Sequence, residues 1–249
     1  MKILTFRPLP ESRHILLCRD IRGSDRLTAI FVRRGGLALA LTILFSLHFI
    51  LLLASVITSW MELETLNQVD YDYEGEEYSL IEKADLAIGG LSGVVSVSLI
   101  VLWCVWTNKS CKNSWLINSR DGATALDRGR DSYSPGWAVG WHFIPIAMLW
   151  KPYQAMAWIR DASQKSLGLT MVKLLGLWWN FWILSSLSDR AVTKMFTKAA
   201  TVEEIEAAHR VLIAISPLDL LSTIFATLVV HRLTKIQKAR GTELGLRAH

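Results

Sequence analysis

Apolar residues gather into long, nearly continuous blocks along this chain, and polar residues fill the segments between the blocks. An α-helix needs about 20 mostly apolar residues to cross a bilayer. Four blocks reach this length, at about 37–60, 86–107, 167–187 and 209–231. We therefore predict an all-α fold, a polytopic bundle of about four transmembrane helices in a single transmembrane domain over residues 37–231. Polar tails over residues 1–36 and 232–249 flank this domain.

A fifth apolar stretch, "SPGWAVGWHFIPIAMLWKPYQAM" at 134–156, is interrupted by proline. Pro135, Pro145 and Pro152 would each break a continuous helix, because proline has no amide hydrogen and clashes with the preceding turn. Non-helical backbone is tolerated at membrane depth only against protein or water. We predict that residues 134–156 form a re-entrant or interfacial segment that enters and leaves on one side. The alternative is a fifth span.

Other residues of this stretch fit such a position. Trp137 and Trp141 are four apart and share a helix face. Gly136 and Gly140 form a GxxxG pattern, which a second helix can approach closely. Tryptophan and tyrosine favour the headgroup level, where the ring is apolar and one polar atom stays hydrated. The stretch ends in a predicted interfacial anchor, formed by Trp150, Lys151 and Tyr153.

The charges of the polar segments predict the orientation, because cytoplasmic loops are enriched in lysine and arginine. Residues 1–36 hold eight basic and three acidic residues, and residues 232–249 hold five basic residues and one acidic residue. Residues 61–84 hold eight acidic residues and one lysine. Both termini are therefore predicted to be cytoplasmic, which requires an even number of spans. Four spans satisfy the rule in every loop, whereas a fifth span over residues 134–156 would place the basic C-terminal tail outside.

Composition agrees with a membrane protein, since 51% of the residues are hydrophobic and the mean hydropathy is +0.31. The formal net charge is +5, but the basic residues flank apolar blocks instead of forming one basic face. Membrane lipid is therefore the expected contact, and nucleic-acid binding is not expected. The three cysteines show no CxxC spacing, so neither a disulfide framework nor a zinc site is predicted. No other metal or cofactor is expected, and protein partners or a homo-oligomer remain open.

Polar residues inside the apolar blocks are the main candidates for a functional site, since they are costly in a membrane and tend to face the bundle interior. Lys173 and Asn180 lie seven apart in the third block. The last block carries a polar stripe within one arc of a helix, formed by His209, Ser216, Asp219, Thr223 and Thr227. We predict that Asp219 pairs with Lys173 or hydrogen-bonds Asn180 in a cleft between the last two spans. The alternative is a stripe that only joins helices, with its hydroxyls bonded to their own backbone.

Two further residues of the blocks bear on this site. Pro217 is expected to kink the last helix beside Asp219 and to free backbone carbonyls. His48 in the first block is interpreted as a packing residue and not as a ligand. The chain has no GxSxG, P-loop or HExxH motif, so an enzyme is not expected. The acidic run "DYDYEGEE" at 70–77 lacks the spacing of an EF-hand and is interpreted as a solvated loop.

The stretch 134–156 closely resembles the signature of the bacterial membrane-protein family called domain of unknown function 4328. The family places this signature after a basic, asparagine-containing stretch, similar to "LWCVWTNKSCKNSWLI" at 102–117. A helix with paired tryptophans follows the signature, similar to "LWWNFW" at 177–182. His142 and Met148 depart from the pattern, in which an aromatic residue and an asparagine usually stand. The resemblance implies a polytopic protein of a bacterial inner membrane, and it supplies no activity, cofactor or catalytic residue.

Two functional classes therefore stay open. The first is a non-enzymatic membrane protein that acts as a scaffold, sensor or regulator through partners or lipid. The second is a small transporter or channel-like protein with a polar site between the last two spans. A cavity that reaches Asp219 and Lys173 would favour the second class, and a dry, packed stripe would favour the first.

Overall fold

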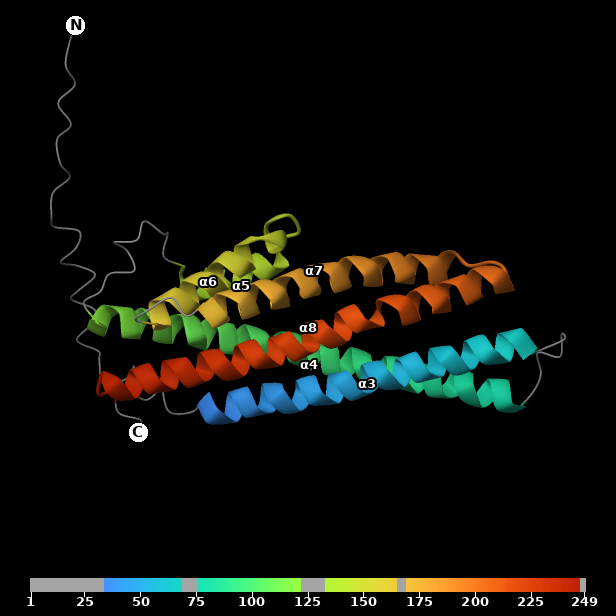
Figure 1. Cartoon of the computed structure of the whole chain (residues 1–249), viewed down its shortest axis with the longest axis horizontal. Coiled ribbons are helices and arrows are strands. Elements are labelled where there is room, and N and C mark those ends of the chain that lie inside the picture. Colours follow the sequence, from blue (N-terminus) through green and yellow to red (C-terminus); the bar gives the residue numbers. More distant parts are fainter. Residues whose placement is uncertain (1–33, 69–75, 122–132, 165–168, 247–249) are drawn as a thin grey trace, which may run out of the picture.

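The structure is a computed structural model that describes residues 34–68, 76–121, 133–164 and 169–246 (Figure 1). Within these residues every regular element is helical, as predicted. Four long helices form the body of the fold: α3 (Arg34–Gln68), α4 (Glu76–Asp121), α7 (Leu169–Lys198) and α8 (Val202–Glu243). Four short helices lie between α4 and α7 in the sequence: α5 (Pro135–Gly140), η3 (Trp141–Phe143), η4 (Ala147–Leu149) and α6 (Lys151–Ser163).

Three of the long helices are long and apolar enough to cross a membrane. They contain the stretches Gly35–Leu66, Leu80–Asn118 and Val202–Glu243. These stretches include the predicted spans 37–60, 86–107 and 209–231. The remaining predicted span, 167–187, falls largely within α7, which is not among the helices that meet this criterion. Lys173 and Asn180 interrupt the apolar sequence of α7, and charged residues follow from Asp189 onward.

The helices continue well past the apolar blocks that predicted them. Residues 232–243, expected to belong to a separate tail, are the last three turns of α8. They remain helical because Leu233 and Gln237 are buried against the rest of the bundle. The N-terminal tail up to residue 33 and most of the acidic run at 70–77 lie outside the described residues.

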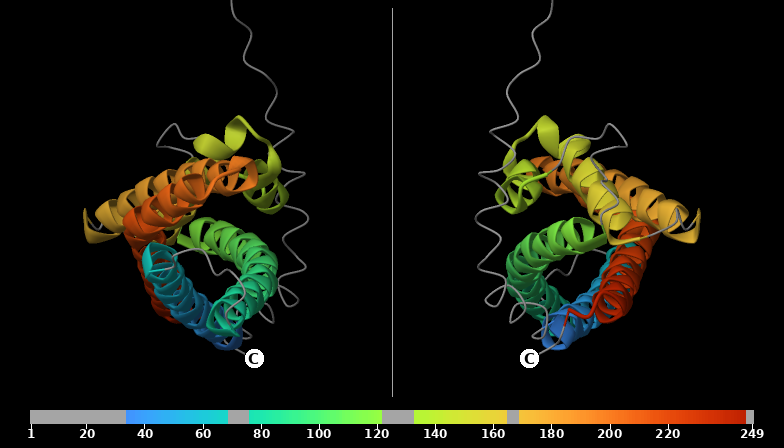
Figure 2. Two further views of the ribbon diagram at one scale, coloured as in Figure 1. Left: turned by 90° about the vertical axis from the view of Figure 1, so that its right-hand side faces the viewer. Right: turned by 90° about the vertical axis from the view of Figure 1, so that its left-hand side faces the viewer.

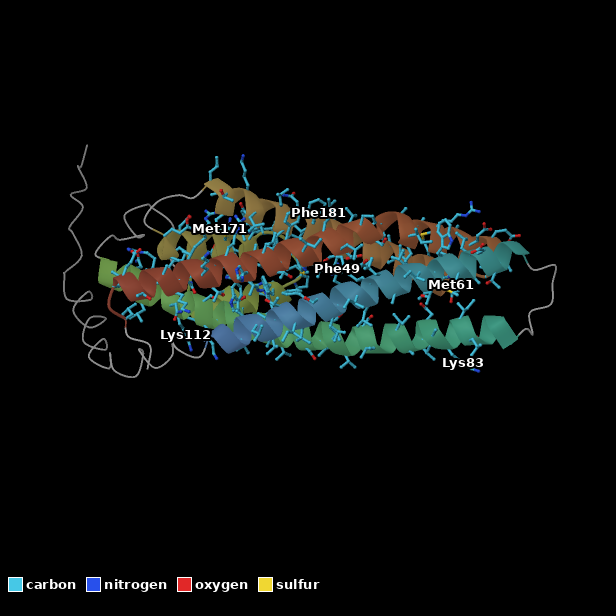
Figure 3. The ribbon with its side chains drawn as sticks, turned by 60° about the horizontal axis from the view of Figure 1, so that its bottom comes forward. Phe49, Met61, Lys83, Lys112, Met171 and Phe181 are labelled. Atoms are coloured by element: carbon cyan, nitrogen blue, oxygen red, sulfur yellow. The ribbon has the colours of Figure 1, made fainter. Side chains whose placement is uncertain are left out.

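The four long helices lie side by side and alternate in direction (Figure 1). α8 packs between α3 and α7, and α4 packs against α3. Lys83 and Lys112 lie at opposite ends of α4, and Met61 near the end of α3 lies at the Lys83 end (Figure 3). The views along the bundle show the short helices against α4 and α7, on the side away from α3 (Figure 2).

The outward faces of α3 and α4 carry large apolar side chains. Examples that are more than half exposed are Leu39, Ile43, Ile50 and Ile57 on α3, and Leu86, Val94, Val97 and Ile100 on α4. A contiguous surface of this kind is unfavourable in water, and it matches the acyl chains of a bilayer. The exposed faces thus agree with the membrane assignment of these two helices.

Residues 133–163 form a broken helical hairpin, which we call the α5–α6 hairpin. The prolines of residues 134–156 determine where its helices begin and end. Ser134 caps α5 by accepting a hydrogen bond from the amide of Trp137 at 3.3 Å, and Pro135 occupies the first turn, where no amide donor is needed. Ile144, the residue before Pro145, has extended dihedrals (φ −96°, ψ 114°), as expected before proline. Pro152 occupies the first turn of α6. The predicted interruption of the helix is confirmed.

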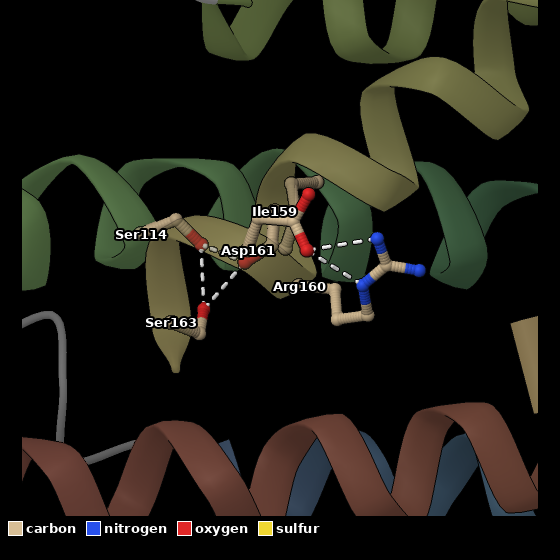
Figure 4. A network of polar contacts seen from close by, with 5 residues as sticks. All are labelled: Ser114, Ile159, Arg160, Asp161 and Ser163. Carbon is tan, nitrogen blue, oxygen red and sulfur yellow. Dashed lines mark hydrogen bonds and ion pairs between the residues drawn. The ribbon is translucent and has the colours of Figure 1, made fainter. Parts of the chain in front are cut away.

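Both ends of the α5–α6 hairpin are bonded to one part of α4. The carbonyl of Tyr133 accepts from Trp115 Nε1 at 2.8 Å. The hydroxyls of Ser163 and Ser114 are 2.9 Å apart, and Ser114 also donates to the carbonyl of Ile159 at 3.1 Å (Figure 4). Two adjacent residues of α4, Trp115 and Ser114, therefore hold the start and the end of the hairpin.

The tip of the hairpin lies further along α4. Trp103 Nε1 is 3.4 Å from His142 Nε2, and Trp179 Nε1 of α7 donates to the carbonyl of Leu149 at 3.2 Å. Trp103 precedes Trp115 by about three helical turns. The hairpin thus advances along α4 and returns to the level at which it began.

The aromatic pair of the hairpin is confirmed, whereas its glycine pattern does not contact a second helix among the described residues. The rings of Trp137 and Trp141 lie 4.7 Å apart, and Lys151 Nζ lies 5.6 Å from the centre of the Trp141 ring. A Cβ at Gly136 would meet no atom within 4 Å, and one at Gly140 would meet only the ring of Trp137. Within the described residues, therefore, no second helix uses this GxxxG pattern as a contact.

Candidate functional site

A cavity of about 470 Å³, which we call the central cavity, lies among α3, α4, the hairpin tip, α7 and α8. Its titratable wall residues are His48, Cys104, His142, Asp189 and Asp219. Its hydroxyl-bearing wall residues are Ser96, Ser185, Ser186, Ser222 and Thr223. Asp189 and Phe143 at its walls are exposed, so the cavity is not sealed. The last two predicted spans therefore supply only part of a site that five elements share.

Two carboxyl groups define the polar side of the central cavity. Asp219 of α8 accepts a hydrogen bond from the hydroxyl of Ser185 on α7. Asp189, one turn further along α7, lies close enough to Asp219 for the two carboxyls to interact electrostatically. Two neighbouring carboxylates repel each other when both are ionised, and a proton or another cation between them relieves this repulsion.

His48 extends the polar side of the cavity onto α3. Its ring is within electrostatic reach of Asp219, and its Nδ1 is buried with no hydrogen-bond partner among the described residues. A buried polar atom is normally hydrogen-bonded, because leaving it unpaired is costly. His48 was interpreted as a packing residue, but its position offers an unused polar atom at the wall of the cavity.

Tryptophan rings also line the central cavity. The ring centres of Trp103 and Trp178 are 5.1 Å apart, those of Trp178 and Trp179 are 5.4 Å apart, and those of Trp179 and Trp182 are 4.9 Å apart. The hydrogen bonds from Trp103 to His142 and from Trp179 to Leu149 fix two of these rings against the hairpin tip. The faces of such rings are electron-rich and attract cations, tryptophan most strongly.

Carboxylates and tryptophan faces both favour a positively charged ligand. Among the described residues, no lysine or arginine lines the central cavity. In that same part of the chain, no group of three or more histidine, cysteine or acidic side chains is arranged to hold a metal ion. The chemistry of the walls therefore fits a proton or a small organic cation better than a coordinated metal.

Neither predicted partner of Asp219 reaches it. Asn180 is exposed, and its side-chain amide donates to the carbonyl of Gly176 on its own helix at 2.8 Å. Lys173 lies in a separate pocket together with Arg232. The structure brings Ser185 and Asp189 to Asp219 instead, because Ser185 lies at the level of Asp219, whereas Lys173 lies about three turns earlier along α7.

Some residues of the predicted polar stripe of α8 line the cavity, and others bond to their own helix or join helices. Asp219 and Thr223 line the central cavity. Ser216 and Thr227 donate to carbonyls of α8 itself, at 2.9 Å each. His209 joins helices, since its Nε2 is 2.9 Å from a carboxylate oxygen of Glu62 on α3.

The sequence held signals for two residues that were missed. Ser185 and Asp189 are four apart and so share a helix face, as the residues of the α8 stripe do. Asp189 was left out because it follows the predicted end of the third span at residue 187. No periodic signal marks His48, which is a single polar residue in an apolar block.

Comparison with known proteins supports the resemblance that residues 134–156 indicated. The model of the family described as "Domain of unknown function (DUF4328)" matches residues 77–235. The match begins at the start of α4 and ends near the end of α8, so it contains the α5–α6 hairpin and most of the central cavity. No curated protein and no solved structure matches the chain.

Proposed function

Because this chain belongs to the family described as "Domain of unknown function (DUF4328)", whose description assigns no activity, we propose its function from the central cavity. We propose that the protein is a non-enzymatic, multi-pass membrane protein that binds a small organic cation in this cavity and transports it. The observation that carries the proposal is the Asp189–Asp219 pair, which lines the same cavity of about 470 Å³ as a cluster of tryptophan rings.

We propose four spans, formed by α3, α4, α7 and α8, with both termini on the cytoplasmic side of a bacterial inner membrane. Basic residues at the proposed cytoplasmic end are Lys109, Lys112, Arg232, Lys235 and Lys238. Acidic residues outnumber basic ones in the segments at the opposite end, and they include Glu62, Glu64, Glu82, Glu203 and Glu204. This separation agrees with the positive-inside rule. The α5–α6 hairpin then enters and leaves on the cytoplasmic side.

The cavity lies at the depth where transporters hold their substrates. His48 and Ser96 are close to the middle of the predicted spans 37–60 and 86–107, and Asp219 is close to the middle of 209–231. Secondary transporters bind substrates near the bilayer midplane, at broken helices. The tip of the α5–α6 hairpin, with His142 at the cavity wall, supplies such an interruption. A scaffold, one of the other roles considered, has no need for an open, acidic cavity at this depth.

Binding is tested with purified protein in nanodiscs, using tetraphenylphosphonium as the probe and tryptophan fluorescence as the signal. We expect quenching by the wild type, and about 10- to 100-fold weaker affinity after Asp219→Asn, because one unit charge near a partly buried cation contributes on that scale. Glu206→Gln is the matched control, since Glu206 lies on the same helix and pairs with exposed Arg210 outside the cavity. Equal affinity of the wild type and Asp219→Asn would overturn the assignment of the site.

Transport is tested separately in proteoliposomes with radiolabelled tetraethylammonium, once it is shown to compete with tetraphenylphosphonium for binding. Tetraethylammonium crosses a protein-free bilayer poorly, whereas the lipophilic tetraphenylphosphonium crosses it unaided. We expect uptake by the wild type and the Glu206→Gln control, and little uptake by Asp219→Asn. Binding without uptake would contradict transport, and it would favour a sensor or regulator that responds to the bound cation.

A further inference from the structure

A second pocket, which we call the basic pocket, lies between α7 and α8 near the start of α7. It measures about 280 Å³ and is lined by Leu169, Thr170, Lys173, Leu174, Leu177 and Arg232. Two cations from two helices face it, and no carboxylate lies among these lining residues. We propose that the basic pocket binds the phosphate of an anionic phospholipid headgroup, with Lys173 and Arg232 as its ligands.

The two cations are available to a ligand. Lys173 and Arg232 are both exposed, and neither forms an ion pair with a carboxylate in the part of the chain that the structure describes. Two like charges at one pocket repel each other, and a phosphate placed between them turns this repulsion into two attractions. The hydroxyl of Thr170 adds an uncharged donor at the same pocket.

The pocket lies at the depth of lipid headgroups. Arg232 follows Asp219 by 13 residues, and Lys173 precedes Ser185, the partner of Asp219, by 12 residues. At about 1.5 Å per residue, both cations are about 18–20 Å from the level of Asp219. The hydrocarbon core extends only about 15 Å from the bilayer midplane. This step rests on the membrane placement proposed above, and it does not depend on what the central cavity binds.

Apolar side chains favour a lipid over a soluble anion. Leu174 and Leu177 line the pocket on the side of the bilayer centre, because they follow Lys173 along α7. Leu177 is 45% exposed, so its surface remains available to an acyl chain. A free phosphate would use the two cations and would leave these leucines without a role. Basic pockets between transmembrane helices on the cytoplasmic side are a general way of binding anionic headgroups.

The proposal is tested by native mass spectrometry of the full chain, after purification from bilayers that contain equal amounts of phosphatidylglycerol and phosphatidylcholine. We expect the wild type to retain phosphatidylglycerol selectively. Lys173→Gln combined with Arg232→Gln should weaken this retention about 30-fold, at about fivefold for each cation. The matched control is Lys235→Gln combined with Lys238→Gln, which removes the same charge from exposed positions one to two turns further along α8. This control should change retention less than twofold.

Three outcomes would overturn the proposal. One is equal loss of phosphatidylglycerol from the pocket variant and the control, which would indicate a diffuse charge effect. Another is equal retention of phosphatidylcholine by the wild type. The third is displacement of the lipid by millimolar inorganic phosphate, which would identify a soluble anion site. Lys173→Arg is the control for misfolding: it changes the same side chain but preserves the charge, so it should preserve the retention of phosphatidylglycerol. Asp219→Asn should leave retention unchanged, so this test is independent of the central cavity.

Discussion

Pro217 removes one hydrogen bond from α8, and the helix continues through it. A helical residue normally donates its amide hydrogen to the carbonyl four positions earlier, and proline has none to give. The carbonyl left without this donor belongs to Ile213, and the hydroxyl of Ser216 donates to it at 2.9 Å. Ser216 is buried, so water cannot serve as an easy substitute. The freed carbonyl is therefore satisfied within the helix and does not line the cavity.

This compensation predicts a coupling between Ser216 and Pro217. Ser216→Ala should destabilise the protein by about 0.5–1.5 kcal/mol, because the Ile213 carbonyl loses its donor. In a Pro217→Ala background the same change should cost less, since residue 217 then has an amide hydrogen for that carbonyl. Denaturant unfolding in detergent micelles measures both values. Thr227→Ala is the control, because Thr227 bonds to Thr223 where the helix keeps its own amide donor. Equal costs of Ser216→Ala in the two backgrounds would contradict the coupling.

At the scale of elements, the α5–α6 hairpin depends on its neighbours for its shape. Its pieces are six, three, three and 13 residues long, and isolated helices shorter than about 12–15 residues are marginal in water. Gln237 of α8 is one of its fixed points. Its side-chain Nε2 lies 3.0 Å from the Ser110 carbonyl, the Ser114 hydroxyl and the Ser163 hydroxyl. One buried amide thus joins α4, α6 and α8.

Removing this amide should loosen the hairpin. Gln237→Ala is expected to lower the free energy of unfolding by about 1–3 kcal/mol, because buried acceptors lose their donor. Lys238→Ala changes the exposed neighbouring residue and should alter it by less than about 0.5 kcal/mol. The measurement is denaturant unfolding in detergent, followed through the tryptophans of the hairpin. If both variants unfold at the same denaturant concentration, Gln237 is not a fixed point of the hairpin.

The elements themselves were largely predictable, because each long helix follows from the length of an apolar block. The pairing between helices was not. Periodicity places Asp219 on one face of α8. It does not determine which residues of α7 pack against that face, or at which level along the helix axis they do so. Asp219 meets Ser185, and the midpoint of the predicted third span lies about two turns earlier, near Leu177. Lys173 was therefore assigned to the wrong depth, and Asp189 was left out.

At the scale of the whole molecule, the central cavity is assembled from segments that are distant in sequence. His48 of α3, His142 of the hairpin and Asp219 of α8 meet at its walls only after the long helices have packed in alternating directions. The residues themselves were visible in the sequence, and their convergence was not. The family signature identified the hairpin because its residues are consecutive, whereas no consecutive motif can identify a site of this kind.

The alternating packing makes a prediction about the sides of the membrane. In a background without the native cysteines, Lys83→Cys and Lys194→Cys should react with a membrane-impermeant maleimide added from outside. Both positions are exposed; Lys83 lies at the acidic end of the bundle (Figure 3), and Lys194 lies in the last turns of α7, which end on the same side (Figure 1). Lys112→Cys and Gln154→Cys should react only after the membrane is permeabilised. Both positions are exposed; Lys112 lies at the basic end (Figure 3), and Gln154 accepts a hydrogen bond from Tyr133, whose carbonyl is bonded to nearby Trp115 of α4. Gln154 decides between the two topologies that residues 134–156 allow. A fifth span would place it outside, so labelling of Gln154→Cys in intact cells would contradict the hairpin, provided that Lys112→Cys stays protected in the same cells.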